Sequence, residues 1–176
     1  MTWPRALPWI ALLIAAGLVV GGVGLPSWLG GGDSPLRPGA TVRAQVERVV
    51  DGDTVAVTVD GREERVRYIG IDTPETVKPN TPVQCFGPTA HALNERLLAA
   101  SDGAVTLRFD HELRDRYDRL LAYVYRDGDG LFVNARLISD GAARTLEIAP
   151  NTTHASELAQ LQTSARAAGR GLWSAC

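Results

Sequence analysis

Three β-rich segments follow one another between residues 41 and 71 with only turns between them, and this succession constrains the fold most. Thr41–Val50 and Thr54–Val59 are joined across Asp51 and Gly52, a pair typical of a tight hairpin turn, and Glu64–Ile71 follows. Consecutive strands joined by such turns pair antiparallel. The sequence therefore predicts an antiparallel sheet at the start of the folded part.

The residues after this sheet alternate between helical and extended patterns. Pro88–Ala100 carries small and aliphatic side chains at helical spacing. The odd positions from Val105 to Phe109 are apolar, as in a half-buried strand, and Leu120–Arg126 is a further β-rich segment before a turn at Asp127–Gly130. Three strands, a helix and two more strands predict a small antiparallel barrel, closed or half closed.

Two more helices are predicted near the C-terminus from residues that can cap them. Asn134 precedes Ala135–Asp140, which ends at Gly141, and Asn151–Thr153 precedes the last apolar pattern of helical period. We expect these helices to pack on the barrel. The predicted class is mainly β with helices (β+α).

The first 40 residues differ from the rest of the chain. No charge occurs from Ala6 to Gly32, and Trp9–Leu25 is almost wholly aliphatic residues and glycine. This run exceeds the ~7–15-residue core of a signal peptide and approaches the ~20 residues that span a bilayer. On a helix, Trp9 and Trp28 would lie roughly 28 Å apart, close to the hydrocarbon thickness of about 30 Å.

Three interpretations of residues 1–29 stay open: an uncleaved transmembrane anchor, a cleaved signal segment, or a buried helix of a soluble domain. Arg5 precedes the apolar run, so the positive-inside rule places the rest of the chain outside the cytoplasm, either on a single-pass anchor or secreted. Residues 30–40 are rich in Gly and Pro and are predicted to be a linker. Residues 41–176 have the length of one domain.

The two cysteines, Cys85 and Cys176, agree with export, because an even number in an oxidising compartment favours a disulfide. The bond would close a loop of about 90 residues, worth roughly 4–5 kcal/mol on chain entropy alone. Two unrelated thiols are the alternative.

The net charge argues against binding nucleic acid through bulk positive charge. Lys+Arg number 18 and Asp+Glu 20, a formal net charge of −2. Removing the two arginines and one aspartate of residues 1–40 leaves 16 basic and 19 acidic residues in the predicted domain. Four of these acids, Asp51, Asp53, Asp72 and Glu75, fall in two short motifs.

Three charged clusters stand out: residues 51–54 (DGDT), 72–75 (DTPE) and 114–119 (RDRYDR). Each alone fits a structural role. The first is a hairpin turn, the second a helix start with Thr73 as N-cap and Pro74 in the first turn, and the third a solvated charged stretch.

Arg67 weighs against three separate structural explanations. In an extended strand it shares a face with Ile69 and Ile71, and a charge on an apolar face needs a partner. Asp53, Asp72 or a bound anion can supply one.

The ordered set of motifs resembles the staphylococcal nuclease, or thermonuclease, family. The resemblance rests on DGDT, on R-x-x-x-x-D-T-P-E (67–75) and on D-R-Y-D-R-x-L-A-Y (115–123). It continues through Phe132-Val133-Asn134 with Gly141, then PNTTH (150–154) and LWS (172–174). It covers essentially all of residues 41–176. The implied fold is a five-stranded OB-fold-type barrel with three α-helices, and the two cysteines resemble an exported, disulfide-bearing branch of the family.

The resemblance implies a site for one Ca²⁺ ion. Asp53 and Asp72 match its carboxylate ligands, and the backbone carbonyl of Thr73 matches a third oxygen ligand. Glu75 matches the general base that activates the attacking water. Asp51 is expected beside the metal, without a direct bond to it.

The resemblance also implies how the substrate is held. Arg67 and Arg119 match two arginines that clamp the phosphate, and Tyr117 and Arg116 add substrate contacts. The implied reaction cleaves the bond from phosphorus to the 5′ oxygen of DNA or RNA and leaves 3′-phosphate ends. The expected partner is sequence-nonspecific nucleic acid, single-stranded or frayed, and the expected state is a monomer.

One departure from the family pattern concerns the nucleotide. Leu146 and Ile148 occupy positions where the best-known member has tyrosines that pack on it. We therefore expect weaker and more salt-sensitive binding. A binding module without catalysis and an anchored envelope protein are the competing hypotheses, and neither needs the complete set of acids and arginines.

Overall fold

The computed structural model describes residues 36–77 and 80–176. The segment predicted as a membrane anchor or signal (1–29) and half of the predicted linker lie outside the described residues. Within these two ranges, no helix combines the length and the apolar character needed to cross a bilayer.

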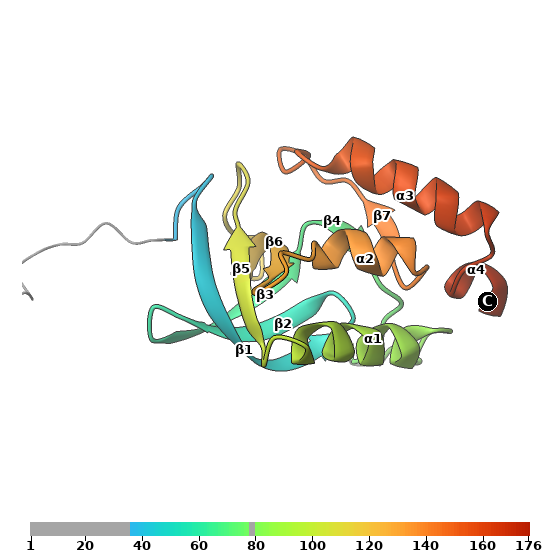
Figure 1. Cartoon of the computed structure of the whole chain (residues 1–176), viewed down its shortest axis with the longest axis horizontal. Coiled ribbons are helices and arrows are strands. Elements are labelled where there is room, and N and C mark those ends of the chain that lie inside the picture. Colours follow the sequence, from blue (N-terminus) through green and yellow to red (C-terminus); the bar gives the residue numbers. More distant parts are fainter. Residues whose placement is uncertain (1–35, 78–79) are drawn as a thin grey trace, which may run out of the picture. The chain divides into compact units, whose positions relative to one another are not determined.

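Five strands form a closed barrel in the order β1-β2-β3-β6-β5 (Figure 1). Their bounds are β1 Thr41–Asp51, β2 Thr54–Val59, β3 Arg62–Tyr68, β5 Ala104–Arg108 and β6 Leu120–Arg126. The predicted hairpin between β1 and β2 is confirmed. All neighbours pair antiparallel as predicted, except β3 and β6, which are parallel. Five strands cannot alternate in direction around a closed ring, so one pair must run the same way. The barrel fits an OB-fold.

The predicted third strand, Glu64–Ile71, is in fact two strands. β3 stays in the barrel, whereas β4 (Gly70–Asp72) pairs with β7 (Arg144–Leu146) in a separate two-stranded sheet. Gly70 permits this break, because its φ is +80° and a Cβ there would lie 2.6 Å from Cδ1 of Leu158. Asp72 therefore lies on the small sheet.

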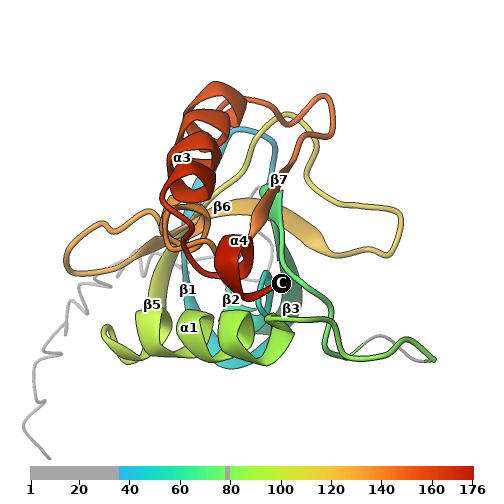
Figure 2. The same cartoon turned by 90° about the vertical axis from the view of Figure 1, so that its right-hand side faces the viewer.

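The helices are α1 (Gly87–Ala99), α2 (Val133–Ser139), α3 (Ala155–Ala167) and the four-residue α4 (Leu172–Ala175). The first three were predicted, and α4 is additional. α1 packs against β1, and α2 contacts β6 on one side and α3 on the other (Figures 1 and 2). Residues of both the barrel and α2, among them Val55, Val66, Leu107 and Leu137, are fully buried and form one core.

The predicted N-terminal helix caps are wrong, whereas Gly141 follows the end of α2 with a φ of +73°, as predicted. Asn134 lies inside α2, where its amide donates to the Ile69 carbonyl (2.8 Å) and its oxygen accepts the Val124 N–H (3.0 Å). Asn151 precedes α3 but binds the backbone N–H and C=O of Glu112. Both side chains instead bind backbone groups of distant segments, and those of Ile69 and Val124 belong to buried residues that would otherwise lack partners.

Cys85 and Cys176 form the disulfide that their number suggested, with a Cα–Cα distance of 6.0 Å. The bond ties the C-terminal residue, directly after α4, to the segment that precedes α1.

Candidate active site

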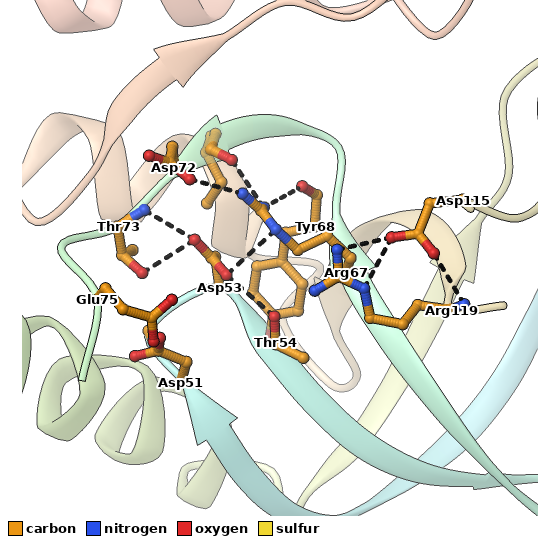
Figure 3. A network of polar contacts seen from close by, with 12 residues as sticks. Asp51, Asp53, Thr54, Arg67, Tyr68, Asp72, Thr73, Glu75, Asp115 and Arg119 are labelled. Atoms are coloured by element: carbon orange, nitrogen blue, oxygen red, sulfur yellow. Dashed lines mark hydrogen bonds and ion pairs between the residues drawn. The ribbon is translucent and has the colours of Figure 1, made fainter. Parts of the chain in front are cut away.

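Asp53 is the centre of a hydrogen-bond network at the turn between β1 and β2 (Figure 3). Its Oδ2 accepts the backbone N–H (2.7 Å) and the hydroxyl (2.9 Å) of Thr73, and its Oδ1 accepts the hydroxyl of Thr54 (3.0 Å). Gly52 makes this approach possible, because a Cβ there would lie 2.7 Å from Oγ1 of Thr73. Gly52 therefore allows residues 51–54 and residues 72–75 to lie in contact.

Arg67 is paired with Asp53 and Asp72, two of the partners predicted for a charge on an apolar strand face. Its Nε lies 3.4 Å from Oδ1 of Asp53, and its Nη2 lies 2.9 Å from Oδ1 of Asp72. Its Nη1 donates to the carbonyls of Tyr68 (2.8 Å) and Ile71 (2.7 Å). The side chain is only 12% exposed. Both predicted acidic partners are confirmed, and the two carbonyls fix the direction of the guanidinium.

Carboxyl groups outnumber cations around Asp53. Burial raises the pKa of Asp72, and the charges of Asp53 and Glu75 raise it further, against the opposing charges of Arg67 and Arg144. Burial also raises the pKa of Asp51, with an added contribution from its hydrogen bond with Glu75. Asp51, Asp53, Asp72 and Glu75 thus give the region an excess of negative charge. Their carboxylate oxygens are the kind of ligand that a hard divalent cation prefers.

The loop after β4 carries Glu75 and is not helical, so the helix start read from Thr73 and Pro74 is wrong. The hydrogen bonds from Thr73 to Asp53 keep this segment at the turn instead. Oε1 of Glu75 accepts the N–H groups of Thr76 (3.1 Å) and Val77 (2.9 Å). These bonds within the loop orient the carboxylate.

Asp51 lies next to this loop. Its Oδ1 accepts the hydroxyl of Thr76 at 2.7 Å and the N–H of Gly52 at 2.8 Å. Asp51 thus connects the β1–β2 turn to the loop of Glu75 by hydrogen bonds.

Arg119 lies on a tight turn that Asp115 closes. Oδ2 of Asp115 accepts Nε (2.7 Å) and contacts Nη2 (2.6 Å) of Arg119, and Oδ1 accepts the N–H groups of Tyr117 and Arg119. Burial opposes the ionisation of Asp115, but these hydrogen bonds outweigh it and hold the pKa of the carboxyl below its ordinary value. The third cluster is therefore an ordered turn, and its central residues 116–118 are exposed to solvent.

The two arginines meet at a pocket of about 480 Å³. Arg116 and Tyr117 also line it, with Nη2 of Arg116 donating to the Tyr117 hydroxyl at 2.7 Å. Leu146 and Ile148 form part of the wall and are 40% and 61% exposed. Figure 3 shows the acidic residues on one side of Arg67 and the Asp115–Arg119 pair on the other. The structure therefore brings all predicted site residues to one region.

Sequence reasoning missed three residues of this region. Gln84 is hydrogen-bonded to Glu75, Asp115 holds Arg119, and Arg144 faces Asp72 across the β4–β7 pair. Arg144 also lies over the ring of Trp173, at 5.5 Å from its centroid. Asp115 was visible inside a charged motif, whereas no local pattern marks Gln84 or Arg144.

Comparison with known proteins identifies similar chains. Residues 65–175 match the family described as staphylococcal nuclease homologue. The thermonuclease of Staphylococcus intermedius is 42% identical over 146 residues, which are 81% of this chain and 84% of that protein. The thermonuclease of Staphylococcus hyicus is 42% identical over 130 residues, 74% and 75% of the two chains. Endonuclease YncB of Bacillus subtilis is 38% identical over 135 residues, 76% of this chain and 62% of that protein.

Proposed function

Because the chain belongs to the staphylococcal nuclease family, we propose that it is a Ca²⁺-dependent endonuclease that hydrolyses phosphodiester bonds of DNA and RNA. The observation that carries the proposal is the joint placement of Arg67 and Arg119 on one pocket, with Asp53 and Asp72 bound to Arg67. The names of the similar thermonucleases and endonucleases support the reaction class.

The donor set fits Ca²⁺, a cation that takes carboxylate, carbonyl and water oxygens together. Asp53, Asp72 and the backbone carbonyl of Thr73 would hold it. The described residues contain no cage of three or more acidic, His or Cys side chains, so water and backbone oxygens would complete the coordination. When bound, the ion would neutralise a non-bridging oxygen of the scissile phosphate.

The protein's own groups would perform the remaining tasks. Glu75, held by loop N–H groups, would orient a water and accept its proton as the water attacks phosphorus. Arg67 and Arg119 would donate to the phosphate oxygens and stabilise the charge of the pentacoordinate transition state. The bond to the 5′ oxygen would break, the leaving oxygen would take a proton from solvent water, and the phosphate would stay on the 3′ end.

The pocket accounts for the proposed substrate class. Arg116 and Tyr117 would contact a neighbouring phosphate, whereas the apolar wall at Leu146 and Ile148 offers no donor that reads a base edge. We therefore propose sequence-nonspecific cleavage of single-stranded or frayed DNA and RNA by a monomer.

We also propose that the nuclease acts outside the cytoplasm. Residues 1–29 would serve as a single-pass anchor or a cleaved signal, residues 30–40 as a linker and residues 41–176 as the nuclease domain. The disulfide supports an oxidising compartment. Cell fractionation that finds the chain only in the cytoplasm would contradict this assignment.

Product analysis tests the proposed reaction. The full chain, in a mild non-ionic detergent, is incubated with a single-stranded oligonucleotide and millimolar Ca²⁺. We expect products with 3′-phosphate and 5′-hydroxyl ends. Products with 5′-phosphate ends would contradict the proposed polarity, and tight binding without any cleavage would favour a binding module instead.

A further inference from the structure

The proposed base, Glu75, has its backbone fixed by one neighbour in the fold. Its N–H donates to Oε1 of Gln84 at 3.0 Å, and its carbonyl accepts the Gln84 N–H at 2.9 Å. Gln84 thus holds both polar backbone groups of Glu75. The Glu75 carboxylate in turn is oriented by the N–H groups of Thr76 and Val77 in its own loop.

Gln84 is itself next to a covalent anchor. Cys85 is bonded to Cys176, 91 residues away in sequence. The C-terminal segment that carries Cys176 is fixed to the fold, because Leu172 is buried and its N–H donates to the Gly141 carbonyl at 2.9 Å. The disulfide therefore links Gln84 to a fixed part of the molecule rather than to a loose tail.

The start of α1 completes the support under the loop. A Cβ on Gly87 would lie 2.7 Å from Cγ2 of Thr76 and 3.0 Å from the Pro74 carbonyl oxygen. Only a residue without a side chain allows the loop to lie this close to the helix. Pro74–Thr76 are therefore seated on α1, with the disulfide at its N-terminal end.

We infer that Gln84 is a positioning residue for Glu75, and that the Cys85–Cys176 disulfide acts on the reaction by fixing Gln84. The inference rests on the proposed function, in which Glu75 activates water. A disulfide that merely stabilises the fold would raise the free energy of unfolding and leave the turnover of the folded protein unchanged. The inference instead predicts an effect on turnover in protein that is fully folded.

The main test is Gln84→Ala in the full chain, with Gln45→Ala as the matched control. Gln45 also bonds a backbone group, since its Nε2 donates to the Asp102 carbonyl, but it lies on β1 and contacts no site residue. We expect Gln84→Ala to lower kcat about tenfold, because a misplacement of about 1 Å can cost about 100-fold. KM for the oligonucleotide and the Ca²⁺ dissociation constant from calorimetry should stay within twofold.

Two further variants separate positioning from stability. Gln84→Glu retains an oxygen that accepts the Glu75 N–H, so it should restore most of kcat. Cys85→Ser/Cys176→Ser, assayed where circular dichroism shows it folded, should lower kcat, and adding Gln84→Ala should then cost less than it does alone.

Equal kcat values for Gln84→Ala and Gln45→Ala would overturn the inference, as would full turnover in the folded double-serine variant. Both outcomes leave the proposed function standing, because the unaltered chain still cleaves. Absence of Ca²⁺-dependent cleavage by the unaltered chain would instead refute the proposed function, and the positioning role with it.

Discussion

The two sides of the site are built differently. The acidic side is assembled from the β1–β2 turn, β3, β4 and the following loop, and it depends on the close approach of Gly52 to Thr73. The arginine side is one short turn, residues 115–119, closed by Asp115. The acidic side is part of the fold, so substitutions there should lower activity and stability together. Substitutions in the turn 115–119 should lower activity with little loss of stability.

Arg67→Ala should have the largest effect on folding and should also lower activity. Its removal leaves the buried carboxylate of Asp53 without its ion pair, and breaking a buried pair costs about 3–5 kcal/mol. Loss of a transition-state donor lowers kcat by about 10²–10³. Urea unfolding and initial rates measure the two effects, and unchanged stability would contradict the account of the acidic side.

Arg119→Ala should lower kcat by a similar factor of about 10²–10³ while costing about 1 kcal/mol of stability or less. The side chain is 28% exposed, and Asp115 keeps its two backbone donors. The same two measurements apply. A loss of stability as large as that of Arg67→Ala would remove the distinction between the two sides.

Gly52→Ala tests the junction on which the acidic side depends. Its new Cβ would displace Thr73, the residue that orients Asp53, so we expect a Ca²⁺ affinity about tenfold weaker. Gly61→Ala is the control, because its φ of +72° makes alanine costly there although its Cβ would meet nothing within 4 Å. Calorimetry that finds equal Ca²⁺ affinity in both variants would contradict the role of Gly52.

The pH dependence of stability should separate Asp115 from Asp72. The pKa of Asp115 is lowered, so its contribution is complete above the unfolded value of about 4 and is lost as the pH falls through the folded value. Asp115→Asn should therefore be less stable than the parent at pH 7 by about 1–2 kcal/mol. This difference should close in acid.

Asp72 should show the opposite sign in the presence of chelator. Its pKa is raised, so the parent loses stability as the pH rises from the unfolded to the folded value. Asp72→Asn should then match or exceed the parent in stability at pH 7, by a small margin because the side chain is 59% exposed. Urea titrations at pH 3 and pH 7 measure both differences, and a shared sign at pH 7 would contradict the contrast.

Leu146→Tyr should leave the fold and kcat unchanged and should lower only KM. A stacked base contributes about 1–3 kcal/mol, and Leu146 borders the pocket of both arginines. KM for a short oligonucleotide measures it at fixed salt. An unchanged KM would show that no base of the substrate stacks at position 146.

The local part of this architecture was predictable from sequence. Hairpin chemistry at Asp51-Gly52 and strand alternation gave the barrel strands, and Arg67 on an apolar face required partners that proved to be Asp53 and Asp72. The ordered motifs, through the resemblance to the staphylococcal nuclease family, supplied the candidate site residues, and the structure brings these residues to one region.

Long-range packing was not predictable. Asn134 and Asn151 read as helix caps, yet they bind backbone groups of distant segments. The break at Gly70 depends on the approach of Leu158, 88 residues away in sequence. The support of Glu75 by Gln84 likewise arises only when the chain folds, because a glutamine in a loop has no distinguishing pattern.

The most direct test of the central claim is the cleavage rate of a labelled oligonucleotide by the full chain and by Glu75→Gln, each in millimolar Ca²⁺ and in chelator. We predict that chelator abolishes cleavage by the parent, and that Glu75→Gln lowers kcat in Ca²⁺ by about 10²–10⁴ with KM little changed. Cleavage that survives chelator, or a Glu75→Gln variant with the turnover of the parent, would contradict the account.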